Sequence, residues 1–266
     1  GAVRQPSCKG AGTMLNGPTF DKLSTLRLPA MGREYRRQLE SPDTRALSFE
    51  DRFGMLVDAE WLSRHNSKLK KLLRLACLRV PNACLEDVDY DPRRKLDRGY
   101  ITRLADCTWI TEHRNLIITG ATGTGKTFLG SAFGNAACRQ GRKTKYYRMN
   151  RLLSDLAIGH GDGSYNRLMR DLKKIDLLIL DDFGMTTLDP VAGRDLLEVI
   201  EDRSGLRSTI ISGQLPVKEW HALFDDSTVA DAVLDRLVHN AYRIELEGPS
   251  KRGMDGTSGN KEAIPI

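Results

Sequence analysis

The chain has 266 residues, of which 40% are apolar and 29% charged, with a formal net charge of +6. No segment approaches the roughly 20 consecutive apolar residues of a membrane span, and the N-terminus lacks the charged-then-apolar layout of a signal peptide. The five cysteines are scattered and form no C-x-x-C pair, which argues against a disulfide framework or a zinc site. These features predict a cytoplasmic globular protein with one large domain, or one large and one small domain.

The basic surplus lies in the N-terminal part of the chain. Residues 1–114 contain 21 Lys/Arg and 15 Asp/Glu, whereas residues 115–266 contain 20 of each. No acidic residue lies between Glu60 and Glu86. Such clustering indicates contact with a nucleic-acid backbone, although a solvated helix face gives the same pattern. The candidates for DNA contacts in this stretch are Arg64, Lys68, Lys71 and Arg74.

The first part of the chain has a helical pattern. Residues 1–18 are rich in Gly, Pro and Ser, and we expect them to form a disordered or vector-derived leader. Apolar residues then recur mostly at spacings of three and four, which predicts a small all-helical N-terminal domain over residues 19–81. Ser48 and Asp51 form a predicted capping box for one of its helices. Residues 82–98 are expected to connect this domain to the next one.

Over residues 99–247 short apolar runs alternate with helical segments. This pattern predicts an α/β domain with a five-stranded parallel sheet flanked by helices. The expected strands are residues 115–119, 143–147, 177–181, 208–212 and 242–246. The third of these runs is continuously apolar, as expected for a central strand that is buried on both faces. Residues 248–266 are expected to form a loose tail.

A complete phosphate-binding loop of the form G-x-x-x-x-G-K-T follows the first expected strand. It consists of Gly120, Ala121, Thr122, Gly123, Thr124, Gly125, Lys126 and Thr127, and Phe128 follows it at the start of the next helix. In such a loop the backbone N–H groups cradle the α/β-phosphates, the lysine reaches the β/γ-phosphates, and the hydroxyl ligates Mg²⁺. Because the flanking strand and helix are also present, we predict ATP and Mg²⁺ as cofactors rather than a glycine-rich turn without a ligand.

Two carboxylates, Asp181 and Asp182, end the third expected strand. This is the edge at which open parallel sheets bind their ligands. We expect Asp181 to hold Mg²⁺ together with Thr127, and Asp182 to orient or deprotonate the attacking water. A pair of aspartates after a strand can also cap the next turn, but the phosphate-binding loop upstream favours the catalytic interpretation.

Two further positions are candidates for catalysis. Gln214 is the first candidate and Ser212 the second, and both lie at the end of the fourth expected strand. Either side chain would form a hydrogen bond to the γ-phosphate or the attacking water, or would only satisfy the turn that follows the strand. Arg236 lies on an expected amphipathic helix. It could pair with Asp235 or Asp231 on an exposed face, or act as an arginine finger for the γ-phosphate of a neighbouring subunit.

Several segments together resemble the IstB family of AAA+ ATPases, which assist insertion-sequence transposases and are related to DnaC-like helicase loaders. The resemblance covers nearly all of residues 19–252. The segments that carry it are residues 23–31 (L-x-x-L-R-L-P-A-M), 58–60 (D-A-E), 120–127, 177–184, 214–216 with Trp220, and 234–239 followed by G-x-S-x-R at 248–252.

The resemblance implies an AAA+ sheet with strand order 5-1-4-3-2 and nucleotide sites between the subunits of an ATP-dependent homo-oligomer, in which Arg236 completes a neighbour's site. It also implies assembly on double-stranded DNA, which is deformed and presented to a cognate transposase. The N-terminal domain would mediate assembly or contact with the transposase. Further candidates for DNA contacts are Arg167, Arg170, Lys173 and Lys174. Arg252 would act as a second nucleotide sensor or be an ordinary solvated arginine.

The sequence also departs from the family pattern. Many AAA+ proteins have Asp-Glu in place of Asp181-Asp182, so we expect slow hydrolysis without DNA or a partner, and Gly213 stands where relatives often have Ser or Asn. Three other functions stay open. They are a replicative helicase loader, a small-molecule phosphotransferase of the P-loop kinase type, and a nucleotide-gated binding module that does not hydrolyse.

Overall fold

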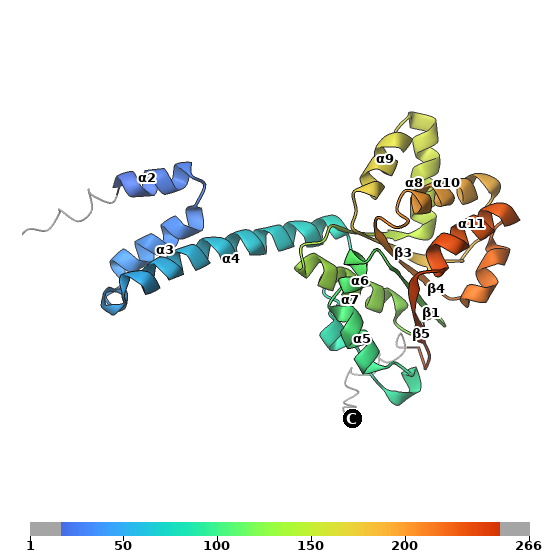
Figure 1. Cartoon of the computed structure of the whole chain (residues 1–266), viewed down its shortest axis with the longest axis horizontal. Helices are drawn as coiled ribbons and strands as arrows, with labels where there is room; N and C mark the ends of the chain where they lie inside the picture. Colours follow the sequence, from blue (N-terminus) through green and yellow to red (C-terminus); the bar gives the residue numbers. More distant parts are fainter. Residues whose placement is uncertain (1–16, 251–266) are drawn as a thin grey trace, which may run out of the picture. The chain divides into compact units, whose positions relative to one another are not determined.

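The computed structural model describes residues 17–250, apart from the side chain of Arg45 (Figure 1). The chain forms two compact units, one ending at Lys70 and the other beginning at Lys71, so that the division falls within helix α4 (Phe49–Ala76). Arg252, the candidate second sensor, lies outside the described residues. Within the described residues, no helix is long and apolar enough to cross a membrane.

The first unit contains helices α2 (Gly17–Thr25) and α3 (Pro29–Glu40), the short helix η1 (Asp43–Ala46) and the first part of α4. The predicted capping box at the start of α4 is confirmed. Ser48 Oγ accepts a hydrogen bond from the Asp51 N–H at 3.1 Å and donates to the Asp51 carboxylate at 2.8 Å. The first turn of α4 is therefore stabilised by residues next to it in the sequence.

The start of α3 is capped by a residue that is distant in the sequence. Its own N-cap residue provides no side-chain hydrogen bond. Instead, Glu60 of α4 accepts from the backbone N–H groups of Ala30 at 2.9 Å and Met31 at 3.1 Å. Arg64 holds Glu60 at 2.8 Å and donates to the Arg27 carbonyl at 2.6 Å. Two of the segments that carried the family resemblance, residues 23–31 and 58–60, therefore meet at this cap.

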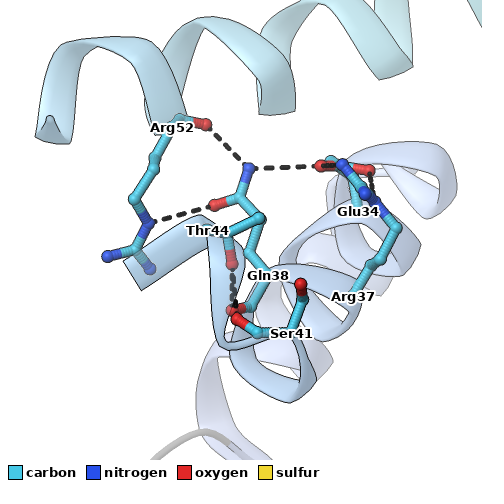
Figure 2. A network of polar contacts seen from close by, with 6 residues as sticks. All are labelled: Glu34, Arg37, Gln38, Ser41, Thr44 and Arg52. Carbon is cyan, nitrogen blue, oxygen red and sulfur yellow. Dashed lines mark hydrogen bonds and ion pairs between the residues drawn. The ribbon is translucent and has the colours of Figure 1, made fainter. Parts of the chain in front are cut away.

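A buried amide joins the helices of this unit (Figure 2). Gln38 is only 1% exposed. Its Nε2 donates to the Arg52 carbonyl at 3.0 Å and to the Glu34 carboxylate at 3.2 Å, and its Oε1 accepts from Arg52 Nε at 3.4 Å. Thr44 of η1 donates to the Gln38 carbonyl at 2.8 Å. The Gln38 side chain thus ties α3 to α4 with its hydrogen-bonding groups satisfied, and the Thr44 hydroxyl ties η1 to the Gln38 backbone.

The second unit alternates strands and helices in the predicted way, and each predicted strand is present within two residues of its expected bounds. Its elements after α4 are η2 (Leu85–Asp87), η3 (Pro92–Arg94), α5 (Arg98–Ala105), α6 (Thr108–Thr111), β1 (Asn115–Gly120), α7 (Lys126–Arg139), β2 (Thr144–Arg148), α8 (Met149–Asp162), α9 (Tyr165–Lys173), β3 (Leu177–Phe183), α10 (Pro190–Glu201), β4 (Ser208–Gly213), η4 (Val217–Leu223), α11 (Ser227–Val238) and β5 (Ala241–Leu246).

The five strands form one parallel sheet in the order β2-β3-β4-β1-β5, which is the predicted 5-1-4-3-2 order read from the other edge. Helix α7 packs on one face, and α8, α10 and α11 cover the other (Figure 1). On β3, Leu178 and Leu180 join the core beneath α8 to α11, while Ile179 contacts α7. The central strand is thus buried on both faces, which explains its unbroken apolar run.

A buried arginine fixes the helices to the edge of the sheet where the strands begin. Arg203 is 1% exposed. It donates to the carbonyls of Leu172 at 2.7 Å and Ile175 at 2.9 Å, to the Ser208 carbonyl at 2.5 Å and to Thr209 Oγ1 at 3.2 Å. Burial lowers the pKa of Arg203 to about 9, which still leaves the guanidinium charged at neutral pH. This side chain thus adds hydrogen-bond donors to carbonyls at the end of α9 and at the start of β4.

Candidate nucleotide-binding site

The phosphate-binding loop, residues 120–127, lies between β1 and α7. Gly123 and Gly125 have φ values of 85° and 96°, in the left-handed region that glycine adopts without steric cost. Lys126 begins α7, and its Nζ donates to the carbonyls of Gly120 at 2.7 Å and Ala121 at 2.9 Å. The N-terminus of α7 and the lysine charge therefore lie at the same place, which suits an anionic phosphate.

A cavity of about 500 Å³ opens beside this loop. Its volume is in the range of small-molecule and cofactor sites. The lining residues come from the loop and α7 (Thr122, Gly123, Gly125, Lys126, Thr127, Phe128 and Leu129), from the ends of strands (Asp182, Gln214 and Leu246), and from the segment before α5 (Val80, Asp87, Val88, Asp89, Arg94 and Leu96). Gly120, Ala121 and Thr124 belong to the loop but are not among the residues that line the cavity.

Asp181 is buried at the end of β3, with 2% of its surface exposed. Its Oδ2 accepts from the hydroxyls of Thr127 and Tyr146, each at 2.7 Å, and its Oδ1 accepts from Ser212. Burial raises the pKa of Tyr146, and the Asp181 charge raises it further, so this phenol stays a donor. The structure thus brings together the two residues predicted to hold the metal.

The donors present in this site fit Mg²⁺. A hydroxyl and a carboxylate are hard oxygen donors, and Mg²⁺ is commonly bound by one or two carboxylates together with substrate phosphates and water. Among the described residues there is no group of three or more His, Cys, Asp or Glu placed to hold a metal ion. Thr127 belongs to the loop that would bind the phosphates, so phosphate oxygens would be close enough to act as further ligands of a metal held by Thr127 and Asp181.

Asp182 has a different environment from its neighbour. The pairing of β3 with β4 is interrupted between Leu180 and Phe183, and Asp182 adopts a left-handed φ of 60° there. Its side chain is 39% exposed and lines the cavity, with Oδ2 at 3.5 Å from Arg148 Nε. A non-glycine residue in this conformation costs free energy, and such residues cluster at functional sites. The irregularity directs adjacent carboxylates into different surroundings.

Gln214 and Ser212 have separate positions. Gln214 lines the cavity, where its Oε1 accepts from Thr122 Oγ1 of the loop at 2.8 Å and its Nε2 lies 3.1 Å from Met185 Sδ. Ser212 is fully buried, and its hydroxyl donates to Asp181. Gln214 is therefore placed to contact a nucleotide, whereas Ser212 acts on the metal-ligand candidate.

Gly213 has a steric explanation. A Cβ at this position would lie 2.8 Å from the Phe183 carbonyl oxygen, because β3 approaches β4 closely after its irregular pairing. A serine or asparagine would need the strand end to move. The departure from the family pattern noted in the sequence is thus coupled to the local geometry of β3.

Arg236 lies away from the nucleotide cavity of its own chain. It is near the C-terminal end of α11, and its Nη2 is 3.0 Å from Glu201 Oε1, so its acidic partner is neither Asp235 nor Asp231. Its carbonyl accepts from Asn115 Nδ2 at 3.1 Å. Asn115 begins β1, whereas the phosphate-binding loop follows the end of β1. Arg236 is therefore at the opposite edge of the sheet from the loop.

The basic candidates on α4 are all exposed, and one of them is engaged by neighbouring groups. Arg64 is engaged by Glu60 and the Arg27 carbonyl, whereas Lys68 belongs to the same unit and is exposed. Lys71 and Arg74 are exposed on the part of α4 that belongs to the second unit. DNA contact by these side chains stays a prediction.

The candidates on α9 are also exposed. Lys173 pairs with Asp202 at 2.9 Å, and Lys174 lies 3.6 Å from Asp171. Arg167 and Arg170 lie one turn apart on the same helix. None of these side chains lines the nucleotide cavity, so a role for them would have to be in binding another molecule.

The segment over residues 80–96 was not expected to take part in the site. Its apolar side chains Val80, Val88 and Leu96 line the cavity, and Arg94 reaches the phosphate-binding loop. No helical or strand period marks these residues, because the segment consists of turns and two short η helices. The buried Arg94 was missed for the same reason, since nothing in a charged, proline-containing stretch distinguishes it from its exposed neighbours.

The strand order, a phosphate-binding loop after β1 and a carboxylate near the end of β3 define an AAA+ P-loop fold. Solved structures share it at low sequence identity. A DnaC helicase loader has a TM-score of 0.52 over 62% of this chain and 97% of its own, at 20% identity. AMPPCP-bound DnaA from Aquifex aeolicus has a TM-score of 0.55 over 66% of this chain and 53% of its own, at 20% identity. At such identities the likeness concerns the fold alone.

The chain belongs to the family of IstB-like ATP binding proteins, whose profile matches residues 21–257. It is 47% identical over 239 residues to an insertion sequence ATP-binding protein of Sinorhizobium fredii, covering 90% of this chain and 97% of that protein. A second relative, from Pseudomonas fluorescens, is 46% identical over 203 residues, covering 76% of this chain and 88% of its own. The resemblance found in the sequence motifs is confirmed.

Proposed function

We propose that this protein is a Mg²⁺-dependent ATPase that assembles on double-stranded DNA, deforms it and assists a partner transposase in insertion-sequence transposition. One observation carries the proposal. A single cavity joins the phosphate-binding loop with Asp182 and Gln214, and Thr127 of that loop is hydrogen-bonded to the buried Asp181. Two relatives, which match 90% and 76% of this chain, are named as insertion sequence ATP-binding proteins, and this supports a role in transposition.

The chain's own residues would divide the work. Lys126 and the N-terminus of α7 would bind the phosphates, and Thr127 and Asp181 would hold Mg²⁺. When bound, Mg²⁺ neutralises charge on the phosphates and orients them for attack. Asp182, which faces the cavity, would accept the proton of the attacking water, and Gln214, held by Thr122, would orient that water.

Contact with DNA would be mainly electrostatic. The exposed basic side chains on α4 and α9 are suited to phosphate contacts, which provide affinity without reading base identity. Arg236, which cannot reach its own loop from the far edge of the sheet, would complete the site of a neighbouring subunit. ATP and DNA would then both favour assembly. We also propose that the protein acts in the cytoplasm, as the sequence analysis predicts.

The first test is the mass of the assembly by light scattering at one stated salt concentration. The full chain is measured with ADP or a slowly hydrolysed ATP analogue, each with and without a short duplex. We expect a large complex only with duplex and the ATP analogue. Lys126→Ala should abolish this growth, whereas Lys218→Ala, which changes an exposed lysine outside the cavity, should not.

The same measurement separates the alternative functions. The fold likeness to a DnaC helicase loader keeps that function as the second candidate, and it predicts growth on single-stranded DNA of the same length in preference to the duplex. A chain that stays small in every nucleotide state and ignores DNA would contradict both and favour a small-molecule phosphotransferase.

A further inference from the structure

Arg94 is a buried arginine that none of the roles described above uses. It lies in η3, with 6% of its surface exposed. Its Nη2 donates to the backbone carbonyl of Thr124 in the phosphate-binding loop at 2.7 Å, and its Nε lies 3.7 Å from the Asp89 carboxylate. A charged side chain is rarely buried so deeply unless its hydrogen bonds matter to the fold or the site.

The backbone that carries Arg94 is fixed on both sides. Asp91 caps η3 by accepting from the Arg93 N–H at 2.9 Å. After Arg94, Lys95 adopts a left-handed φ of 49° and its Nζ pairs with Glu247 at 2.7 Å. The Arg94 carbonyl itself accepts from the Glu247 N–H at 3.4 Å. The segment is thus fastened to the chain immediately after β5, and the guanidinium has a defined direction.

The last residue of β5 and the segment after it also lie against the phosphate-binding loop. A Cβ at Gly120 would overlap the Leu246 carbonyl oxygen, and one at Gly123 would overlap the Ser250 hydroxyl. Only glycine can allow this close approach at Gly120, where φ is 150°. The loop is therefore supported from outside by two segments that are linked to each other, one carrying Arg94 and one following β5.

We propose that Arg94 is a positioning residue for nucleotide binding, which acts on the loop through the Thr124 carbonyl. In a trans peptide the carbonyl and the next N–H point in opposite directions. By holding the Thr124 carbonyl, Arg94 turns the Gly125 N–H away from itself and fixes the direction of the N–H groups that begin α7. The inference rests on the proposed function, since it concerns the same nucleotide site.

The test is calorimetric binding of ADP and of a slowly hydrolysed ATP analogue to the full chain. Arg94→Met removes the hydrogen bond and keeps most of the side-chain volume. We expect both nucleotides to bind about tenfold more weakly, a loss in the range for a hydrogen bond made by a charged group. The loss should be equal for the two nucleotides, because the loop N–H groups serve the phosphates that they share.

The adjacent Arg93 provides a matched control. Its side chain is 65% exposed and pairs with Asp91 at 2.6 Å, and it does not line the cavity. Arg93→Met should leave both affinities within about twofold. If Arg94→Met does not fold, Arg94→Lys serves instead. Lysine keeps the charge but lacks the planar guanidinium group. The affinity for both nucleotides should still fall by about threefold, and the unfolding midpoint in the absence of nucleotide should not change.

Three results would overturn the inference. The first is an unchanged nucleotide affinity in the Arg94 variant, and the second is an equal loss of affinity in Arg93→Met. The third is a loss of affinity for the ATP analogue alone, which would make Arg94 a direct ligand of the γ-phosphate. Failure of the proposed function is distinguishable because it is read from the unaltered chain, which would then bind neither nucleotide or, in the light-scattering measurement, would not assemble on duplex. Lys126→Ala, measured alongside, shows the effect of removing a residue of the loop itself.

Discussion

At the residue scale, the site depends on two adjacent aspartates that share a chemistry but not an environment. Asp181 is buried and accepts three hydroxyl hydrogen bonds, which fix the orientation of its carboxylate. Asp182 is partly exposed and faces the cavity from a left-handed backbone conformation. The first is suited to be a fixed metal ligand, and the second to exchange a proton with water.

Asp182→Asn tests this division. We expect ATP hydrolysis to fall by at least 100-fold, the scale of general-base catalysis, while ATP binding changes by less than about twofold. Phosphate release is measured with and without duplex, and Asp225→Asn, at an exposed position outside the cavity, is the control. Undiminished hydrolysis would remove Asp182 from the mechanism, and it would leave unexplained why this residue tolerates its backbone strain.

Arg148 restrains Asp182 in the structure. It ends β2, and its Nε lies 3.5 Å from Asp182 Oδ2, so an ion pair occupies the carboxylate that would accept the proton of the attacking water. We predict that Arg148→Ala raises hydrolysis in the absence of DNA several-fold. Steady-state phosphate release measures it, with Arg151→Ala as the control because Arg151 pairs with Asp155 within α8. A fall in hydrolysis would mean that Arg148 assists catalysis instead of restraining it.

The sequence shows some of these residues and conceals others. Lys126, Thr127 and the two aspartates stand in local motifs whose spacing reflects a mechanism, so they could be predicted. Tyr146 and Arg148 could not, because their place beside Asp181 and Asp182 comes from the register of β2 against β3, which pairs Arg148 with Asp181. Arg94 and its contact with the loop depend likewise on tertiary structure.

At the element scale, helix starts show the same contrast. The capping box of α4 is local and was predicted from Ser48 and Asp51. The cap of α3 comes from Glu60, which lies 30 residues after Ala30 in the sequence. No sequence spacing predicts a contact over that distance. The sequence singled out residues 58–60 as a family feature without a structural reason, and the cap provides one.

Glu60→Ala should destabilise the first unit by about 1–2 kcal/mol, because two buried or partly buried N–H groups lose their acceptor. Urea unfolding measures the loss in free energy of unfolding, and hydrogen exchange of the Ala30 and Met31 amides measures the loss of protection at the cap itself. Glu40→Ala, at an exposed position of α3, is the control and should cost little. Equal protection of the two amides in both variants would contradict the capping role.

The same carboxylate should make the first unit sensitive to acid. Burial pushes the pKa of Glu60 up, but hydrogen bonds from Arg64, Met31 and Ala30 outweigh it and hold this pKa below its ordinary value of 4.5. A carboxyl with a lowered folded-state pKa stabilises above its unfolded pKa, and the contribution is lost as the pH falls through the folded value. Stability should therefore decline below about pH 4.5.

Glu60→Gln isolates this effect. The variant should be less stable than the unaltered chain at neutral pH, and the difference in unfolding free energy should shrink as the pH falls below about 4.5. Urea unfolding at a series of pH values measures it. A difference that stays constant with pH would show that the charge of Glu60 contributes nothing to the cap.

At the scale of the whole molecule, the bounds of the strands were predictable because buried parallel strands are short apolar runs between turns, whereas the order of the strands was implied by the family resemblance. The division of the chain within α4 was not, since a continuous helix gives no turn signal at Lys70. The cavity also needs residues 80–96, which come before β1 in the chain and carry no motif.

The position of Arg236 makes a prediction about how subunits cooperate. It belongs to the edge where β1 begins, and it is bound to Glu201, so the loop at the end of β1 in its own chain is out of reach. If it acts on a nucleotide at all, that nucleotide must belong to another subunit. Arg236→Ala should then lose hydrolysis in the assembly while each chain still binds ATP.

Mixing two inactive variants decides whether the finger acts between subunits. Arg236→Ala keeps Asp182, and Asp182→Asn keeps Arg236, so a site is complete only where the second variant faces the first. In an equal random mixture about one interface in four meets this condition, so DNA-stimulated hydrolysis should return to about a quarter of the unaltered rate. No recovery in the mixture, with assembly verified by light scattering, would show that Arg236 completes no neighbouring site and that its bond to Glu201 is structural.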